Sequence, residues 1–442
     1  MSGAAPTLRI TGMGAAGDGL SVLPDGTPCF VARALPGESV RALPGARRRE
    51  GCAATLVEIL EPSPDRVAPP CPHFVEGCGG CAVQHWAPDA QAAWKQAQVA
   101  EALSRAGFRD VPVAPTVTTP AGRRRRADFA LRRAGPAIRI GFHAAGSGEV
   151  LDLSACTVLD PRIVALLPAL RGLLRGVRAL RREGSAVVNL LDTGPDLLLR
   201  TDGTLTAEDR VALAGFGERQ GLPRIAWAPK DGAAEAAAQL GPATIALSGV
   251  EVAPAPGAFL QASPEGEAAI IAAVLAALPA KLSGRGRIAD LHAGLGTLSF
   301  PLAARGRVTA FEGDAAAIAA LSAAAGRSGL SVTATRRDLA RQPLTATELA
   351  PFAAVVLDPP FAGAAEQVAL LARSQVPVVV YVSCNPAALS RDARAFAAAG
   401  WRVTAATPID QFVHSAQVEA VIAFTPGRAA SPGPSRRLPG RT

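Results

Sequence analysis

Residues 287–300 read Arg-Ile-Ala-Asp-Leu-His-Ala-Gly-Leu-Gly-Thr-Leu-Ser-Phe, an apolar segment that passes through a glycine-containing loop into a helical segment. A second apolar segment, 308–311, is followed by Glu312, which lies 22 residues after Asp290 at the end of the first segment. A strand, a glycine loop, a helix and a second strand that ends in an acid are typical of a Rossmann-like nucleotide site, where that acid binds a ribose hydroxyl. Residues 251–428 are therefore predicted to form a Rossmann-like α/β domain.

The same loop bears on the choice of nucleotide. NAD and S-adenosylmethionine both carry an adenosine ribose, so both suit the acid at the second strand end. The full G-x-G-x-x-G pattern is absent, because Gly294 and Gly296 are followed by Ser299. The third glycine serves a pyrophosphate-binding turn, which S-adenosylmethionine does not need, and this favours S-adenosylmethionine.

Two further acids follow expected strands of this domain. Asp338 ends a third strand, and Asp358 follows a fourth at residues 353–357. Each acid alone could cap a helix. Together with Asp290 and Glu312 they are expected to line one crevice at the carboxyl edge of the sheet.

Cys384 is expected at the same edge. The β-branched and aromatic run 378–382 predicts a buried strand, and Ser383, Cys384, Asn385 and Pro386 end it in a polar turn. A single cysteine at a strand end is more often a small buried hydrophobe than a nucleophile, so Cys384 needs further support.

Composition limits the remaining possibilities. The chain has 442 residues, of which 49% are hydrophobic, a formal net charge of +8 and a pI near 9.6, with arginine supplying nearly all of the positive charge. Guanidinium groups favour a polyanionic partner such as RNA. No signal peptide or membrane-spanning run is visible, which predicts a soluble, cytoplasmic protein, and no feature requires a protein partner.

The chain is expected to be multidomain. Short apolar segments between Gly and Pro turns in residues 1–61 predict a small β-barrel, and five prolines follow in residues 62–72. The barrel resembles a TRAM domain, an OB-like RNA-binding fold, in the pattern GMGAAGDGLS at 12–21 and ALPGE at 34–38. A barrel with no ligand is the alternative. Residues 62–250 predict a central α+β domain, and 429–442 predict a disordered basic tail.

Four cysteines of the central region form a candidate metal site. Cys71, Cys78 and Cys81 have the spacing C-x6-C-x2-C, and Cys156 is the candidate for the fourth ligand. Four thiolates can hold zinc or an iron–sulfur cluster, and spacing alone does not decide between them. Cysteines that pack without metal are the remaining alternative.

Arg123, Arg124, Arg125 and Arg126 precede an alternating segment and could project guanidinium groups from a strand toward RNA phosphates. A solvated surface face is the alternative reading of this run.

The motifs DLHAGLG, FEGD, LDPP, YVSCNPAAL and QVEAVIAF occur in that order and resemble the RNA uracil-5-methyltransferase family over essentially the whole chain. CPHF, CGGC, QHW and a distant fourth cysteine look like the [4Fe–4S] site of the members that act on large-subunit ribosomal RNA, with one extra residue between Cys71 and Cys78. The resemblance implies a class I S-adenosylmethionine-dependent fold, Cys384 as the nucleophile and Glu419 as the base. The expected S-adenosylmethionine contacts are Gln261, His292, Gly294, Gly296, Thr297, Glu312, Asp338 and Asp358.

The implied reaction explains why a thiol and a base are both needed. C5 of uracil is too weakly nucleophilic to take a methyl group from a sulfonium, so a thiolate first adds to C6 and gives C5 carbanion character. After methyl transfer a base removes the C5 proton, and elimination frees the cysteine. The expected substrate is a uridine of 23S rRNA; transfer RNA, or an RNA-binding assembly factor without activity, are the alternatives.

Five positions depart from the family pattern. They are His292, Ala293, Thr297, Phe361 and Gln417, where the family usually has Phe, Cys, Asn, Arg and His. Individual contacts and the choice of RNA target are expected to depend on them.

Overall fold

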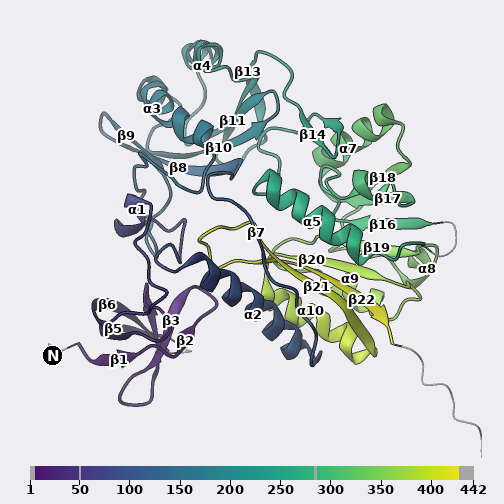
Figure 1. Cartoon of the computed structure of the whole chain (residues 1–442). Coiled ribbons are helices and arrows are strands. Elements are labelled where there is room, and N and C mark those ends of the chain that lie inside the picture. The colour runs from purple at the N-terminus through teal and green to yellow at the C-terminus, as the bar shows by residue number, and fades with distance from the viewer. Residues whose placement is uncertain (1–4, 49–50, 283–285, 428–442) are drawn as a thin grey trace, which may run out of the picture.

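The computed structural model describes residues 5–48, 51–282 and 286–427, so the tail expected at 429–442 lies outside the described residues. Three large sheets follow one another along the chain (Figure 1). No helix in these ranges combines the length and apolar character needed to cross a bilayer.

The N-terminal sheet has six strands in the order β1-β5-β6-β4-β3-β2. They are β1 (Thr7–Arg9), β2 (Gly12–Met13), β3 (Asp18–Val22), β4 (Pro28–Ala32), β5 (Ser39–Arg48) and β6 (Gly51–Glu61). Val31, Val40 and other alternate residues form its buried core. The short strands expected in this region are confirmed, whereas its identity as a TRAM barrel stays a prediction.

The central sheet is mixed and has the order β13-β12-β11-β10-β8-β9. Its strands are β8 (Arg126–Ala134), β9 (Ala137–Gly141), β10 (Glu183–Leu191), β11 (Gly194–Thr201), β12 (Arg224–Pro229) and β13 (Glu235–Gln239). Helices α3 (Pro161–Gly176) and α4 (Ala207–Gln220) lie together on one side of this sheet (Figure 1). The short helix α1 (Pro72–Val75) precedes this domain, and a hairpin of β14 (Ile245–Leu247) and β15 (Val250–Val252) follows it.

The C-terminal sheet has eight strands in the order β18-β17-β16-β19-β20-β22-β21-β7. They are β16 (Arg287–Leu291), β17 (Arg307–Glu312), β18 (Val332–Arg336), β19 (Ala354–Leu357), β20 (Val379–Ser383), β21 (Trp401–Asp410), β22 (Glu419–Pro426) and β7 (Val117–Thr118). The strands from β18 to β20 are parallel, and β22 runs antiparallel to β20. The Rossmann-like prediction is confirmed.

Helices cover both faces of this sheet, because alternate residues of the buried strands point to opposite faces. Val379 and Tyr381 of β20 face a core shared with α2 (Pro88–Ala106), α9 (Ala365–Ala372) and α10 (Pro386–Ala398). Val380 and Val382 face a second core shared with α5 (Pro264–Ala277) and α6 (Ser299–Leu302). The remaining helices are α7 (Ala315–Ser328) and α8 (Ala346–Leu349).

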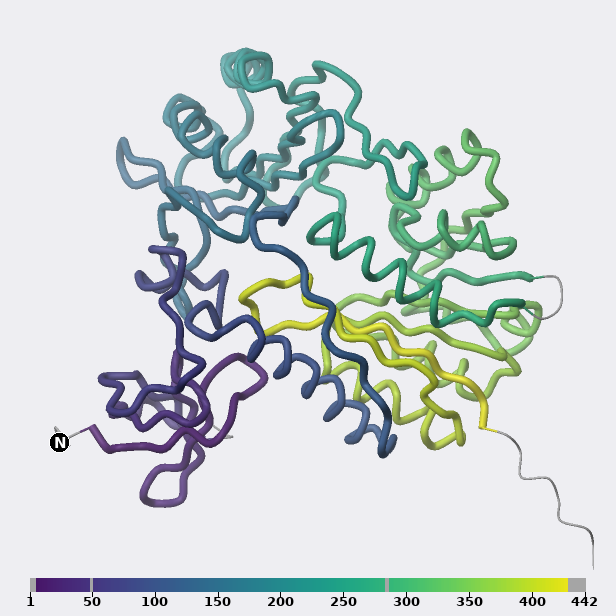
Figure 2. The backbone as a smooth tube through the Cα atoms, viewed as in Figure 1, coloured from purple at the N-terminus to yellow at the C-terminus, as the bar shows by residue number. Residues whose placement is uncertain are grey.

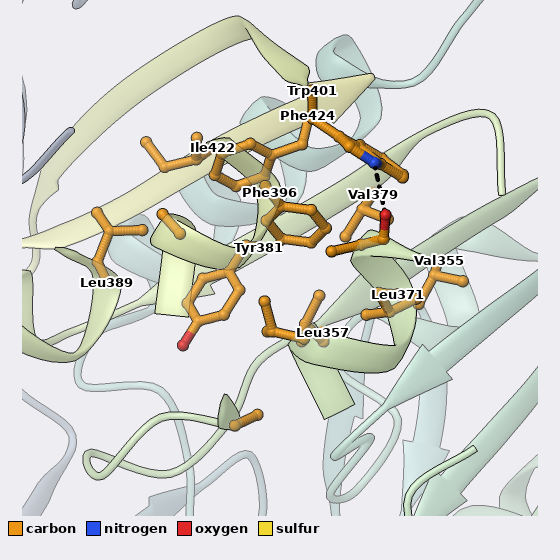
Figure 3. Close-up of a cluster of buried hydrophobic side chains, with 14 of the residues drawn as sticks. Val355, Leu357, Leu371, Val379, Tyr381, Leu389, Phe396, Trp401, Ile422 and Phe424 are labelled. Atoms are coloured by element: carbon orange, nitrogen blue, oxygen red, sulfur yellow. Dashed lines mark hydrogen bonds between the residues drawn. The ribbon is translucent and has the colours of Figure 1, made fainter. Parts of the chain in front are cut away.

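Aromatic side chains fill the first of these cores (Figure 3). The ring of Phe396 from α10 stacks on Phe424 of β22 at a centroid distance of 4.5 Å and lies 5.0 Å from Trp401. The Trp401 indole donates a hydrogen bond to the Ala372 carbonyl at 3.0 Å.

The expected central domain, residues 62–250, does not form one packing unit. Helix α2 lies along the C-terminal sheet (Figure 2), and Val99 and Leu103 share the core of Phe396. Strand β7 extends the same sheet by pairing with β21. The sequence of α2 shows an apolar face but not which sheet covers it, so the domain boundary at residue 62 stays a prediction.

Candidate active site

A cavity of about 1010 Å³ lies at the carboxyl edge of the C-terminal sheet, as expected for an open α/β fold. Its lining includes nine candidate residues: Gln261, Asp290, His292, Gly294, Thr297, Glu312, Asp358, Cys384 and Glu419. Segments more than 120 residues apart in the chain therefore meet in one cavity.

Two expected residues, Asp338 and Gly296, do not line this cavity. Asp338 is exposed and caps the backbone N–H groups of Ala340 and Arg341. Asp338 thus performs the alternative capping role, and its contact with a nucleotide stays a prediction.

The glycine loop is fixed by the acid of the second strand. The Gly294 N–H donates to Glu312 Oε2 at 2.8 Å, and the Asp314 N–H donates to Glu312 Oε1 at 2.8 Å. His292 has a φ of 61°, an uncommon conformation for a residue with a Cβ, and its Nε2 is buried without a partner in the part of the chain that the structure describes. This uncommon backbone conformation begins the glycine loop, and His292 Nε2 is available to a ligand.

Gly296 is required by its conformation and by its neighbour. Its φ is 96°, and a Cβ there would lie 2.7 Å from the Phe300 ring. Gly296→Ala is expected to displace the loop and weaken S-adenosylmethionine binding by about tenfold or more, as measured by calorimetry. Gly326→Ala on α7, where a Cβ meets open space, is the matched control. Equal affinities for both variants would contradict this role.

Asp290 is a buried carboxyl and Asp358 a partly buried one, and they lie at neighbouring strand ends. Burial raises the pKa of Asp290 to about 7, although Ser299 Oγ donates to its Oδ2 at 2.5 Å. Asp290 Oδ1 has no partner among the described residues. Burial also raises the pKa of Asp358 to about 6, against the hydrogen bond from Gln261 Nε2 at 3.1 Å. The cavity is therefore lined by carboxyl groups whose pKa values would change if a charged ligand were bound.

The strand register brings Cys384 and Glu419 together. Antiparallel pairing of β20 with β22 aligns Ser383 with Ala420, so the residue after Ser383 lies beside the residue before Ala420. Asn385 then caps α10 by accepting the Ala387 N–H at 3.0 Å, which turns the chain at Cys384. The thiol and the carboxyl thus reach the cavity from adjacent strands.

Both groups keep their protons to a higher pH than the free side chains do. Burial, followed by the charges of Glu419 and Asp358, raises the pKa of Cys384 to about 12. Burial and the charge of Asp358 raise the pKa of Glu419 to about 8. A positively charged ligand between them would stabilise the thiolate and the carboxylate.

Two further cavity residues, Gln411 and Phe259, had no sequence signal that assigned them to the site, whereas Phe361 was already noted as a departure from the family pattern. Gln411, in the loop between β21 and β22, donates to Glu419. Phe259 and Phe361 line the cavity with 68% and 57% of their surface exposed. In the sequence Gln411 looks like an ordinary polar loop residue. Only the register of β21 and β22 shows that its side chain lies against Glu419.

The four candidate metal ligands converge on one loop region. Burial raises the pKa of Cys81 to about 12, and the charges of Cys156, Cys78 and Cys71 add to the shift. Burial also raises the pKa of Cys78 and of Cys156, and the charge of Cys71 adds to both shifts. Within the described ranges, however, no three His, Cys, Asp or Glu side chains have the spacing that holds a metal ion.

The arginine run is divided between several roles. Arg125 is buried, and its Nη2 binds Glu267 Oε2 of α5 at 2.5 Å, so it joins the central sheet to the C-terminal domain. The expectation of a strand that projects all four guanidinium groups is not met at Arg125, because its side chain is buried against Glu267 and only Arg126 of the run lies in β8. Arg123 binds Glu265 at 2.6 Å. Arg124 and Arg126 line the cavity.

Known proteins resemble this chain in sequence and in fold. A family model described as tRNA (Uracil-5-)-methyltransferase matches residues 289–425. The Pyrococcus abyssi tRNA (uracil-54, C5)-methyltransferase, solved with S-adenosyl-L-homocysteine, covers 95% of this chain and 100% of its own with a TM-score of 0.70. At 19% sequence identity, this structural likeness shows a shared fold.

Two curated relatives match nearly full length. An uncharacterized RNA methyltransferase of Caulobacter vibrioides is 41% identical, over 95% of this chain and 99% of its own. The 23S rRNA (uracil(1939)-C(5))-methyltransferase RlmD of Halomonas elongata is 35% identical, over 94% of this chain and 88% of its own. These matches and the family model show that the chain belongs to the RNA uracil-C5 methyltransferase family.

Proposed function

We propose that this RNA uracil-C5 methyltransferase modifies one uridine of 23S rRNA, with S-adenosylmethionine as methyl donor and Cys384 as covalent nucleophile. The observation that carries the proposal is the pairing of β20 with β22, which sets Cys384 beside Glu419 in the cavity that Glu312 also lines. RlmD relatives of similar length, named for a 23S rRNA uridine, support the choice of RNA.

The residues present fit the methyl donor. Glu312, at the second strand end, is in the position to bind ribose hydroxyls, and Gly294 and Thr297 border the same part of the cavity. His292 Nε2 and Asp290 Oδ1 are buried polar atoms that have no partner within the described ranges, and a polar ligand would satisfy them. When bound, S-adenosylmethionine supplies an electrophilic methyl group on a cationic sulfur.

In the proposed reaction Cys384 loses its thiol proton to solvent, and its sulfur forms a bond to C6 while the C5–C6 π electrons move toward C5. The C5 carbanion forms the bond to the methyl carbon, and the carbon–sulfur bond of the donor breaks to leave a neutral thioether. Glu419 then takes the C5 proton, the C5–H electrons restore the C5–C6 double bond, and the bond from C6 to Cys384 breaks. The target base must leave its stack to reach Cys384.

Purified enzyme, S-adenosylmethionine with a labelled methyl group, and separate 23S rRNA and tRNA transcripts test the substrate. We expect 5-methyluridine in 23S rRNA at a single position. Labelling of tRNA alone would overturn the choice of RNA. Label in neither RNA would favour a non-catalytic RNA-binding role.

Arg124 and Arg126 are the members of the arginine run that we propose to contact RNA phosphate, since both border the cavity. The N-terminal sheet, as a TRAM-like barrel, is proposed to add a second RNA contact. An Arg126→Gln variant that binds 23S rRNA with unchanged salt dependence would remove Arg126 from this role.

We also propose that Cys71, Cys78, Cys81 and Cys156 hold a [4Fe–4S] cluster. The C-x6-C-x2-C spacing with a distant fourth cysteine, which resembles the cluster site of the family, supports this proposal. The cluster would fix the loop that carries Gly79 and Gly80.

Anaerobic purification is expected to give a brown protein with about four iron and four sulfide per chain. Cys81→Ser is expected to lose most of the iron and the visible absorbance. Cys52→Ser, which changes a buried cysteine of β6 in the N-terminal domain, is the matched control and should keep both. Zinc in place of iron, or full iron content in Cys81→Ser, would contradict the assignment.

A further inference from the structure

Gln411 uses both ends of its side-chain amide inside the cavity wall. Its Nε2 donates to Glu419 Oε2 at 2.7 Å and to Gln261 Oε1 at 2.9 Å. Its Oε1 accepts the Ala262 N–H at 3.1 Å. A flipped amide would set oxygen against oxygen at two contacts and nitrogen against an N–H at the third, so the network fixes the orientation.

The two oxygens of Glu419 are therefore unequal. Oε2 is occupied by Gln411, whereas Oε1 is buried and has no partner among the described residues. A carboxylate held at one oxygen by a neutral donor keeps its second oxygen available to accept a proton. Only 3% of Glu419 is exposed, so water does not offer a replacement for the amide.

Helix α5 holds Gln411 in place. Gly266, in its first turn, leaves room for the side chain, because a Cβ at 266 would lie 2.6 Å from Gln411 Cβ and 3.0 Å from Oε1. Ser263 caps the same turn through the Gly266 N–H. Gln411 itself is only 5% exposed. The amide is thus confined from two sides before any substrate binds.

The network also reaches the second carboxyl group of the cavity. Gln261 accepts from Gln411 with its Oε1 and donates from its Nε2 to Asp358 Oδ2 at 3.1 Å. Glu419 and Asp358 are thereby linked through two amides, each of which donates to one carboxyl group. This arrangement holds two neighbouring acids at fixed positions without adding charge.

We infer that Gln411 is a positioning residue for the base: it fixes Glu419 through Oε2 so that Oε1 faces the C5 proton of the uracil adduct. This inference rests on the proposed role of Glu419. Gln411 touches neither the methyl donor nor the uracil in this role, and it acts on proton removal after methyl transfer.

Gln411→Met keeps the length of the side chain and removes the donor. On RNA with tritium at uridine C5, tritium release is expected to fall about 10- to 100-fold, as for loss of a hydrogen bond to a charged group. The pH at half-maximal release is expected to rise, because the carboxylate loses a stabilising donor. Gly266→Ala, which displaces Gln411 without removing it, should shift both quantities in the same direction.

RNA that contains 5-fluorouridine separates positioning from general damage. Fluorine cannot leave C5 as a proton does, so the covalent adduct accumulates after methyl transfer and its formation does not need the base. Gln411→Met should form this adduct within about threefold of the wild-type rate. Gln239→Met, on the exposed strand β13, is the matched control and should leave all three measurements unchanged.

Wild-type tritium release with an unchanged pH midpoint in Gln411→Met would overturn the inference. Equal loss of adduct formation and tritium release would also overturn it, because the residue would then support the whole site. If the wild type forms no adduct with 5-fluorouridine RNA, the proposed covalent function fails first, and the two failures are thereby distinguished.

Discussion

Cys384→Ala is expected to abolish 5-methyluridine formation, with a loss of at least about 10⁴-fold, because no other group can activate C5. Cys384 follows a strand whose residues are all buried and stands beside Glu419 in the register of β20 and β22. Cys384 lines the same cavity as Glu312 and Asp358, which are proposed to bind the methyl donor. Transfer of labelled methyl groups to 23S rRNA measures the effect.

Two controls identify the cause of that loss. Cys384→Ala should keep its melting temperature and its affinity for S-adenosylmethionine, since the thiol is only partly buried. Cys29→Ala, in the N-terminal sheet, should retain methylation within about threefold. Methylation by Cys384→Ala at the wild-type rate would contradict the covalent mechanism.

Glu419→Gln is expected to stop the reaction one step later. The amide cannot accept the C5 proton, so turnover should fall by about 10²- to 10⁴-fold while the methylated uracil remains bonded to Cys384. A protein–RNA band that survives denaturing electrophoresis measures the trapped adduct on ordinary RNA. Glu218→Gln, at an exposed position of α4, is the matched control. Normal turnover, or slow turnover without an adduct, would contradict the role of Glu419.

The same variant makes a stability prediction whose sign follows from burial. The pKa of Glu419 is about 8 in the folded chain, above its ordinary value of 4.5. Between these values the folded chain keeps a proton that the unfolded chain has released, so wild-type stability falls as the pH rises across this window. Glu419→Gln escapes this loss and should melt about 3 °C or more above the wild type at pH 8, with little difference at pH 4.

Much of the catalytic edge was predictable because strand ends leave a clear sequence pattern. Apolar runs that stop at Asp290, Glu312, Asp358 and Cys384 end at one edge of a parallel sheet, and all four residues line the cavity. The likeness to the family identified Glu419 as a candidate base. The register of β20 and β22 then showed that Glu419 lies beside Cys384.

The missed features depend on packing between distant segments. In the sequence Arg125 looks like a surface charge, whereas in the structure it is paired with Glu267 of α5. Gln411 gains its role only where β21, β22 and α5 meet. None of these contacts leaves a local signal.

Mass mapping of the adduct on a 23S rRNA fragment that contains 5-fluorouridine tests the covalent mechanism most directly. After digestion with protease and nuclease, one peptide is predicted to carry the methylated fluorouridine, and fragmentation should assign the bond to Cys384. No adduct in the presence of S-adenosylmethionine, or an adduct on any other residue, would contradict the proposed mechanism.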